Sequence, residues 1–87
     1  MPVYMVERSL GGIAMEDLAA AQRTAIRTAE DYSRRGTPMR YIRSTFAPED
    51  GRCLCLFEAA SADEVRRLND EAKIPYTRVV PALDLTP

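Results

Sequence analysis

The sequence predicts a ferredoxin-like α+β fold, in which four antiparallel strands form a sheet and two helices cover one of its faces. Three observations predict it. Two strand-like segments flank a tight turn at residues 48–51, a helical pattern occupies residues 15–35, and a helix-capping signal begins at Ser61. With strand signals at both ends of the chain, the element order is β-α-β-β-α-β. We expect the chain to form a single domain over residues 1–87, because 87 residues leave no room for a second.

The first third of the chain indicates a strand and then a long helix. Residues 3–9 favour a strand, and the glycines that follow at positions 11 and 12 permit a turn. From Met15 to Arg35, small or apolar residues recur every three or four positions and predict a helix that lies close on a sheet. They are Leu18, Ala21, Ala25, Ala29 and Tyr32. Acidic residues in the first turn, basic residues in the last and Gly36 after it agree with both helix ends.

The middle of the chain predicts a β-hairpin. Residues 39–47 alternate bulky and polar side chains as a strand does, and residues 52–59 form a matching strand. Between them, Pro48 presets one backbone angle of a turn and Gly51 accepts a positive φ. The hairpin therefore supplies two adjacent antiparallel strands of the sheet.

The C-terminal third predicts a shorter helix and a final strand. Ser61 and Glu64 match a capping box, in which the serine binds a free amide and the glutamate reaches back. Val65, Leu68 and Ala72 form the buried stripe, and Pro75 ends the helix soon after Lys73. Residues 77–85 form the last strand. Because Pro81 cannot donate a ladder hydrogen bond, we expect this strand at an edge of the sheet.

Composition argues against several classes of partner. Twelve basic and thirteen acidic residues are spread along the chain and give a net charge of −1, so no basic stripe is present to neutralise phosphates. We therefore expect no nucleic-acid partner. The apolar runs fall far short of the ~18 residues of a membrane span, and the N-terminus lacks a signal-peptide pattern. We expect a cytoplasmic protein that binds no membrane.

Both cysteines lie on the second hairpin strand, at Cys53 and Cys55. At positions i and i+2 of a strand their Cα atoms are roughly 6.5–7 Å apart, at or beyond the usual limit for a disulfide. Two thiolates, with two more from a second copy, would complete a four-sulfur site for a soft metal. Because buried free cysteine usually behaves as a small hydrophobic residue, we expect reduced thiols and no metal ligand.

The face of the sheet without helices is where we expect a functional site, because it must be solvated, covered by a partner or shaped into a pocket. A hairpin that closes symmetrically about its turn pairs residues across this face. The expected pairs are Thr45 with Leu54, Arg43 with Leu56 and Tyr41 with Glu58. The opposite, helix-covered face is expected to hold Ile42, Ser44, Phe46, Cys53, Cys55 and Phe57.

Glu7 is expected to join this face from the first strand. In the usual strand order the first strand lies antiparallel to the third, which brings Glu7 level with residues 52–54 and within reach of Arg43. The resulting face mixes aliphatic side chains with arginine, tyrosine and glutamate. Such a surface suggests an interface or a pocket more than a bare solvated surface.

Four segments of the chain resemble a known family. They are Pro2-Val-Tyr-Met-Val-Glu-Arg8, Arg40-Tyr-Ile-Arg-Ser44, Asp50-Gly-Arg-Cys-Leu-Cys-Leu-Phe-Glu-Ala59 and Ser61-Ala-Asp-Glu-Val65. They look like those of a family of small bacterial domains of unknown function that includes nickel-binding members. The resemblance covers nearly the whole chain and implies a ferredoxin-like homodimer related to the dimeric α+β barrels. It also implies that metal binding relies on histidine, and this chain has none, so no nickel ligand carries over.

Three functions stay open, and the residues name no cofactor. The first is a dimeric domain that binds a small ligand or a metal, with Leu54, Leu56 and Glu58 as ligand-binding residues. The second is a cofactor-free enzyme, of isomerase, cyclase or oxygenase type, for a small apolar anionic or carbonyl compound. Its catalytic residues would be Glu7 as acid or base, Arg43 as anion holder and Tyr41 beside them. The third is a structural interaction module, in which a Glu–Arg ion pair serves an interface.

Overall fold

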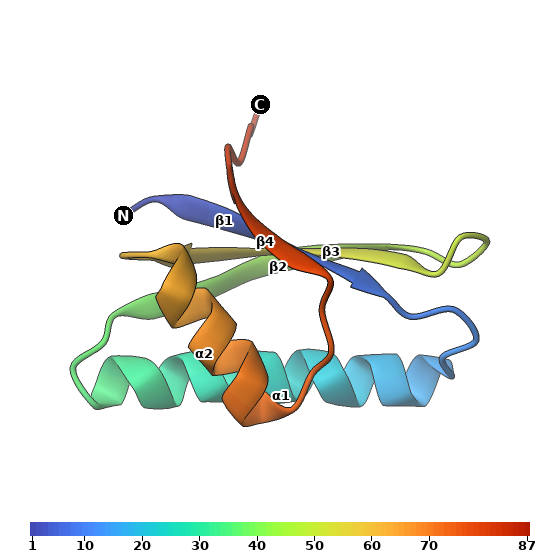
Figure 1. The fold of residues 1–87 in the computed structure, drawn as a ribbon, viewed down its shortest axis with the longest axis horizontal. Helices are drawn as coiled ribbons and strands as arrows, with labels where there is room; N and C mark the ends of the chain where they lie inside the picture. The colour runs from blue at the N-terminus through green and yellow to red at the C-terminus, as the bar shows by residue number, and fades with distance from the viewer.

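The computed structural model describes residues 1–87 and has the expected order of elements, β-α-β-β-α-β. The strands are β1 (Val3–Ser9), β2 (Met39–Ala47), β3 (Arg52–Ala59) and β4 (Arg78–Ala82), and the helices are α1 (Met15–Arg34) and α2 (Ala62–Ala72). The sheet order is β2-β3-β1-β4 with every neighbouring pair antiparallel. Both helices lie on one side of the sheet (Figure 1), which confirms the ferredoxin-like fold. Neither helix is both long enough and apolar enough to cross a membrane.

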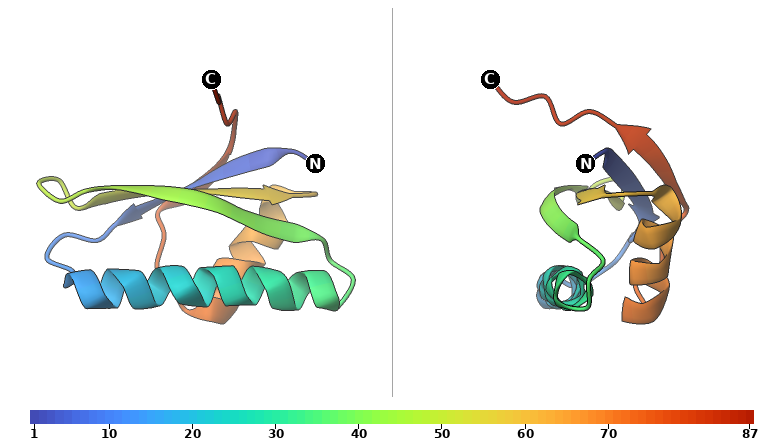
Figure 2. Two further views of the ribbon diagram at one scale, coloured as in Figure 1. Left: turned by 180° about the vertical axis from the view of Figure 1, so that it is seen from behind. Right: turned by 90° about the vertical axis from the view of Figure 1, so that its left-hand side faces the viewer.

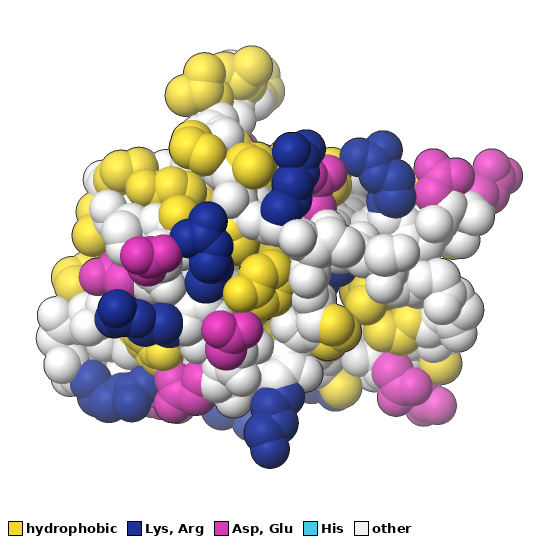
Figure 3. Space-filling view, viewed as in Figure 1, with side chains coloured by type: hydrophobic (Ala, Val, Ile, Leu, Met, Phe, Trp, Pro, Cys, Tyr) yellow, Lys and Arg dark blue, Asp and Glu magenta, His cyan; other side chains and the backbone are white.

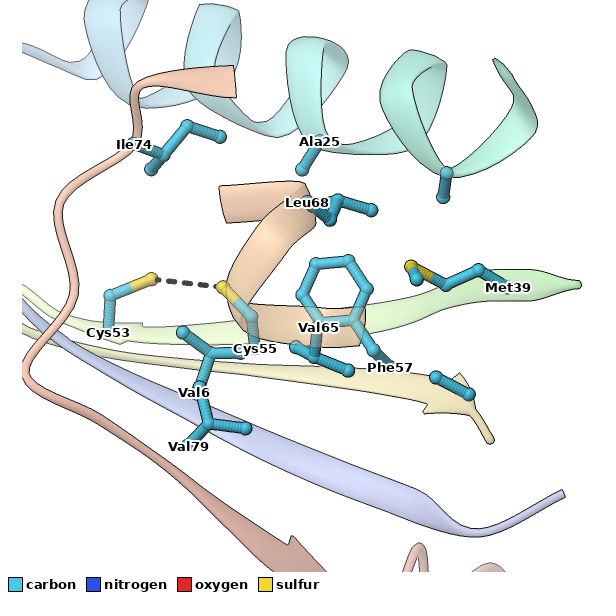
Figure 4. Packing of buried hydrophobic residues seen from close by; sticks show 12 residues of the cluster. Val6, Ala25, Met39, Cys53, Cys55, Phe57, Val65, Leu68, Ile74 and Val79 are labelled. Carbon is cyan, nitrogen blue, oxygen red and sulfur yellow. Dashed lines mark hydrogen bonds between the residues drawn. The ribbon is translucent and has the colours of Figure 1, made fainter. Parts of the chain in front are cut away.

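The core lies between the sheet and the two helices. Val6 of β1, Phe57 of β3, and Val65 and Leu68 of α2 are wholly enclosed there. Figure 4 shows their side chains meeting in one layer. The side chains of Cys53 and Cys55 lie in the same layer, as expected. The expected face of α1 is also confirmed. Its small or apolar residues point into this layer, namely Leu18, Ala21, Ala25, Ala29 and Tyr32.

The helix ends agree only in part with expectation. The Ser61 hydroxyl accepts a hydrogen bond from the N–H of Glu64 at 3.2 Å, as in a capping box. The expected return contact from the Glu64 side chain is wrong, because Oε1 of Glu64 is buried without a partner. Helix α1 ends at Arg34, one residue earlier than expected, and Gly36 follows with a φ of 95°.

Two turns pack against each other at one end of the sheet. Gly51, which closes the hairpin turn, has a φ of 71°, and its carbonyl accepts a hydrogen bond from the N–H of Leu10 at 2.7 Å. A Cβ atom at Gly51 would lie 2.5 Å from the backbone of Gly11. The hairpin turn is therefore fixed against the turn that leads from β1 into α1.

The last strand is shorter than expected, because β4 ends at Ala82 and the remaining residues form a tail. The edge position of this strand is confirmed. The tail leaves the sheet on the side without helices (Figure 2). Asp84 of the tail forms an ion pair with Arg43 of β2, 3.1 Å between Nη2 and Oδ2. Because β2 and β4 are the two opposite edges, this contact carries the tail across the width of the sheet.

Candidate functional site

The side of the sheet opposite the helices is the candidate site, and we call it the open face. Its apolar floor is half-buried and is made of Val3, Met5, Leu54, Leu56 and Val80. Charged side chains lie around this floor. They are Glu7, Arg40, Arg43, Arg52, Glu58 and Arg78, with Asp84 from the tail. The predicted pairs Thr45–Leu54 and Arg43–Leu56 are confirmed.

Glu7 lies where the strand order predicted, opposite Leu54 and two residue pairs away from Arg52. Its side chain is only 16% exposed and forms ion pairs with two arginines from neighbouring strands. One is with Arg52, 3.6 Å between Nη2 and Oε1, and the other is with Nε of Arg78. The prediction that Glu7 contacts Arg43 is wrong, because Arg43 pairs with Asp84. The Glu7 carboxylate is thus held by a pair of cations at the end of the sheet near the turns.

The prediction that Tyr41 lies on the open face is wrong. A β-bulge between Tyr41 and Arg43 shifts the register, so that Tyr41 lies opposite Phe57 and not opposite Glu58. The Tyr41 ring packs edge-on against Phe57, with centroids 5.5 Å apart, and its hydroxyl accepts a hydrogen bond from Nε2 of Gln22 in α1 at 2.9 Å. Tyr41 therefore faces the helices and does not meet Glu7 or Arg43 on the open face.

The same bulge brings other residues to the open face. Arg40 takes the position opposite Glu58, and its Nε lies 3.2 Å from Oε1 of Glu58. The hydrogen bond from Arg40 lowers the pKa of Glu58 from its ordinary value, so this carboxyl is held in its charged form. Ile42, expected on the helix-covered face, lines a groove with these two residues.

This groove lies between the tail and the strands at the end of the sheet away from Glu7. It has a volume of about 490 Å³, which suits a small molecule. Its lining residues are Met1, Pro2, Val3, Arg40, Ile42, Glu58, Pro81, Ala82, Leu83, Asp84 and Thr86. The groove thus combines an apolar wall with a paired arginine and two carboxylates.

The two cysteines face the helices, as expected, and both are buried free thiols. Their sulfur atoms lie 3.8 Å apart and point toward one another (Figure 4). Burial, followed by the proximity of Cys55, raises the pKa of the Cys53 thiol to about 11, so Cys53 is protonated at neutral pH. Neither thiol belongs to the open face.

Beside the cysteines lies a cluster of buried polar side chains that the sequence analysis did not predict. Arg8 of β1 is only 4% exposed, and Asn69 of α2 is fully buried. Nη2 of Arg8 donates to Oδ1 of Asn69 at 2.7 Å, Nη1 donates to the carbonyl of Pro75 at 3.1 Å, and Nε donates to Sγ of Cys55 at 3.4 Å. The available signal was strand alternation: with Glu7 on the open face, Arg8 must point to the helices.

Comparison with known proteins places the chain in a family. The sequence profile of the family described as "Nickel responsive protein SCO4226-like" matches residues 4–81, which is most of the chain. This chain belongs to that family. A solved structure of one SCO4226-like protein, titled "Crystal structure analysis of SCO4226 from Streptomyces coelicolor A3(2)", has the same fold. It aligns with a TM-score of 0.79 at 20% identity over 97% of this chain and 99% of the other. No protein of curated function matches the sequence.

The nickel-responsive character of the SCO4226-like family raises the question of whether these residues fit a nickel ion. The chain has no histidine, and no group of three or more cysteine or acidic side chains is placed to hold a metal ion. The acidic side chains of the open face are engaged by arginines, and the two thiols are buried. Nickel needs at least four nitrogen, oxygen or sulfur donors, so the residues of one chain do not fit it.

Proposed function

We propose that this member of the SCO4226-like family is a homodimeric small-ligand-binding domain, in which two copies meet through their open faces. The observation that supports it is the floor of five half-buried apolar side chains on a sheet face that no helix covers. Contiguous apolar surface rimmed by polar residues marks protein–protein or ligand-binding sites. A second copy would complete the burial of this floor. The apolar floor therefore favours a dimer over a face that is exposed to solvent.

The sheet edges offer a poorer route to a dimer. β4 carries Pro81, which cannot donate to an added strand. β2 carries a bulge and two arginines, Arg40 and Arg43, which interrupt and charge the other edge. Bulges, prolines and charged residues at an edge disfavour pairing with another strand. Contact through the open faces is therefore the arrangement that we propose.

The charges around the floor suit both a second copy and an anionic ligand. Four arginines face three acidic groups there, so the open face carries one net positive charge, and two such faces repel one another only weakly. Figure 3 shows basic and acidic side chains interspersed on the side of the molecule that carries α2 and β4. We propose a small, largely apolar anion or carbonyl compound as the ligand, held between the two copies over Leu54 and Leu56, with Glu58 and Arg43 beside it.

A single substitution at the centre of the open face tests the dimer. Leu56→Arg adds a charge to the floor while leaving the helix-covered core intact, because Leu56 points away from the helices. We expect the wild-type protein to be a dimer by analytical ultracentrifugation and the variant to be a folded monomer. Ala20→Arg, which places the same charge on an exposed position of α1, is the matched control and should stay dimeric.

The same proteins test the ligand site with 8-anilinonaphthalene sulfonate, a small apolar anion that fluoresces when bound. We expect enhanced fluorescence with the wild-type protein and with Ala20→Arg, and a clear loss with Leu56→Arg. A wild-type protein that is monomeric at micromolar concentration would contradict the dimer. Equal fluorescence from all three proteins would place the probe elsewhere and contradict the ligand site.

A further inference from the structure

The buried cation Arg8 has no acidic partner. Its guanidinium forms no ion pair, and its three hydrogen bonds go to a carbonyl oxygen, an amide oxygen and the sulfur of Cys55. Burying a charge without a counter-charge is costly, and most buried charges are paired or bind a metal complex or ligand. Only 4% of Arg8 is exposed, so water supplies little compensation. The surroundings of Arg8 therefore favour an added negative charge.

The group best placed to supply that charge is the pair of thiols. Cys53 and Cys55 come from one strand, share a face and hold their sulfur atoms 3.8 Å apart. Sγ of Cys55 also accepts a hydrogen bond from the Ser44 hydroxyl at 2.9 Å. Arg8 and Ser44 thus both donate to this sulfur, which is an arrangement suited to a thiolate that carries negative charge.

We propose that Cys53 and Cys55 form a two-coordinate site for a soft monovalent metal ion, of which Cu⁺ is the biological example, with Arg8 as the counter-charge. On binding, each thiol releases its proton to solvent and forms one sulfur–metal bond. Two thiolates and one monovalent cation carry a net charge of −1, which the guanidinium of Arg8 balances. This site lies in the core and is separate from the open face of the proposed dimer.

The geometry fits such an ion. Metal–thiolate bonds of about 2.3 Å put two sulfurs in a linear complex about 4.6 Å apart. The observed 3.8 Å must therefore widen by less than about 1 Å, which small rotations of the two side chains provide. Soft thiolate ligands favour Cu⁺ as well as zinc. Divalent ions that need four donors find no third ligand here.

A surface hollow gives a route to the site. It has a volume of about 420 Å³ and is lined by Asn69, Asp70, Lys73, Ile74, Pro75 and Tyr76. Two of these residues, Asn69 and Pro75, are the hydrogen-bond partners of Arg8. Local opening of the segment between α2 and β4 would expose Arg8 first and the sulfurs behind it.

Silver ion, a soft monovalent ion that air does not oxidise, is the probe for the test. Native mass spectrometry and titration calorimetry should show one Ag⁺ bound per folded wild-type chain and no bound Ni²⁺. Cys53→Ser and Cys55→Ser should each lower the silver affinity at least about 100-fold, with circular dichroism showing that both variants stay folded. A folded wild-type chain that takes up no silver, or a serine variant with wild-type affinity, would overturn the proposal.

The role of Arg8 as the counter-charge can be tested separately. Arg8→Gln should lower the affinity for Ag⁺ about 10- to 100-fold, the usual effect of losing a group beside a metal ligand, and leave the affinity for Hg²⁺ unchanged. The reason is that a bis-thiolate complex of a divalent ion is neutral. Asn69→Asp keeps Arg8 and gives it a carboxylate partner, and it should produce the same selective loss. Equal weakening of both metals, or of neither, would show that Arg8 is not the counter-charge.

Discussion

At the scale of single residues, one buried contact joins distant parts of the chain. Arg8 in β1 and Asn69 in α2 are 61 positions apart, yet their side chains meet at 2.7 Å in the core. Asn69 also donates from Nδ2 to the carbonyl of Val65 at 2.8 Å, so both ends of its amide are engaged. The pair fixes the end of α2 against the sheet through polar contacts that a purely apolar core would lack.

Loss of this contact should be costly. Asn69→Ala removes an acceptor from a buried cation, and we expect the free energy of unfolding to fall by about 3 kcal/mol in urea denaturation. Glu30→Ala, at an exposed position of α1 without an ion pair, is the control and should change it by less than about 0.5 kcal/mol. A small effect at Asn69 would mean that water replaces the lost amide oxygen.

At the scale of elements, the hairpin shows how far the sequence could predict the structure. The turn at residues 48–51 sets the register of the pairs next to it, so Thr45–Leu54 and Arg43–Leu56 were predictable. Beyond Arg43 the bulge moves Tyr41 to the other face, and no glycine or proline in the sequence marks that bulge. Arg8 and Asn69 were missed for a related reason, because their partners lie far away in the sequence.

The two packed turns carry a prediction of their own. Gly51→Ala forces a side chain into a positive φ and against the backbone of Gly11, which cannot move without disturbing the bond from Leu10. We expect the urea midpoint to fall, with a loss of about 2 kcal/mol or more and an unchanged m-value. Gly11→Ala is the matched control.

Gly11 has open space around its Cα and no positive φ, so an alanine there meets no obstacle. We expect Gly11→Ala to be neutral or slightly stabilising, because alanine restricts the unfolded chain. Equal destabilisation by the two substitutions would mean that the loss comes from the turns in general and not from the close approach at Gly51.

At the scale of the whole molecule, the C-terminal tail extends the proposed dimer surface. A four-stranded face with strands about 4.8 Å apart and roughly 20 Å long projects an area on the order of 400 Å², below the ~800 Å² per partner of a standard interface. The tail supplies further apolar surface on the same side, since Leu83 and Leu85 are 82% and 85% exposed. Contact of these leucines with the second copy would make up much of the difference.

The joint substitution of Leu83→Ser and Leu85→Ser tests this contribution. We expect the dimer dissociation constant to rise about tenfold or more, because burying even part of each leucine contributes about 1 kcal/mol. Sedimentation equilibrium measures it. Met15→Ser, which removes an exposed apolar side chain from the helix layer, should leave the constant unchanged. A tail variant that dimerises like the wild type would confine the interface to the sheet.

The blunted edges of the sheet also decide how far association can proceed. A face-to-face contact uses the same surface on both copies and is consumed once two molecules have met, so the assembly closes at that point. Pro81 on one edge strand and the bulge with its arginines on the other leave no template for a third chain to extend the sheet. Concentrated solutions of the folded protein should therefore resist fibre formation, and any polymer would have to start from unfolded chains.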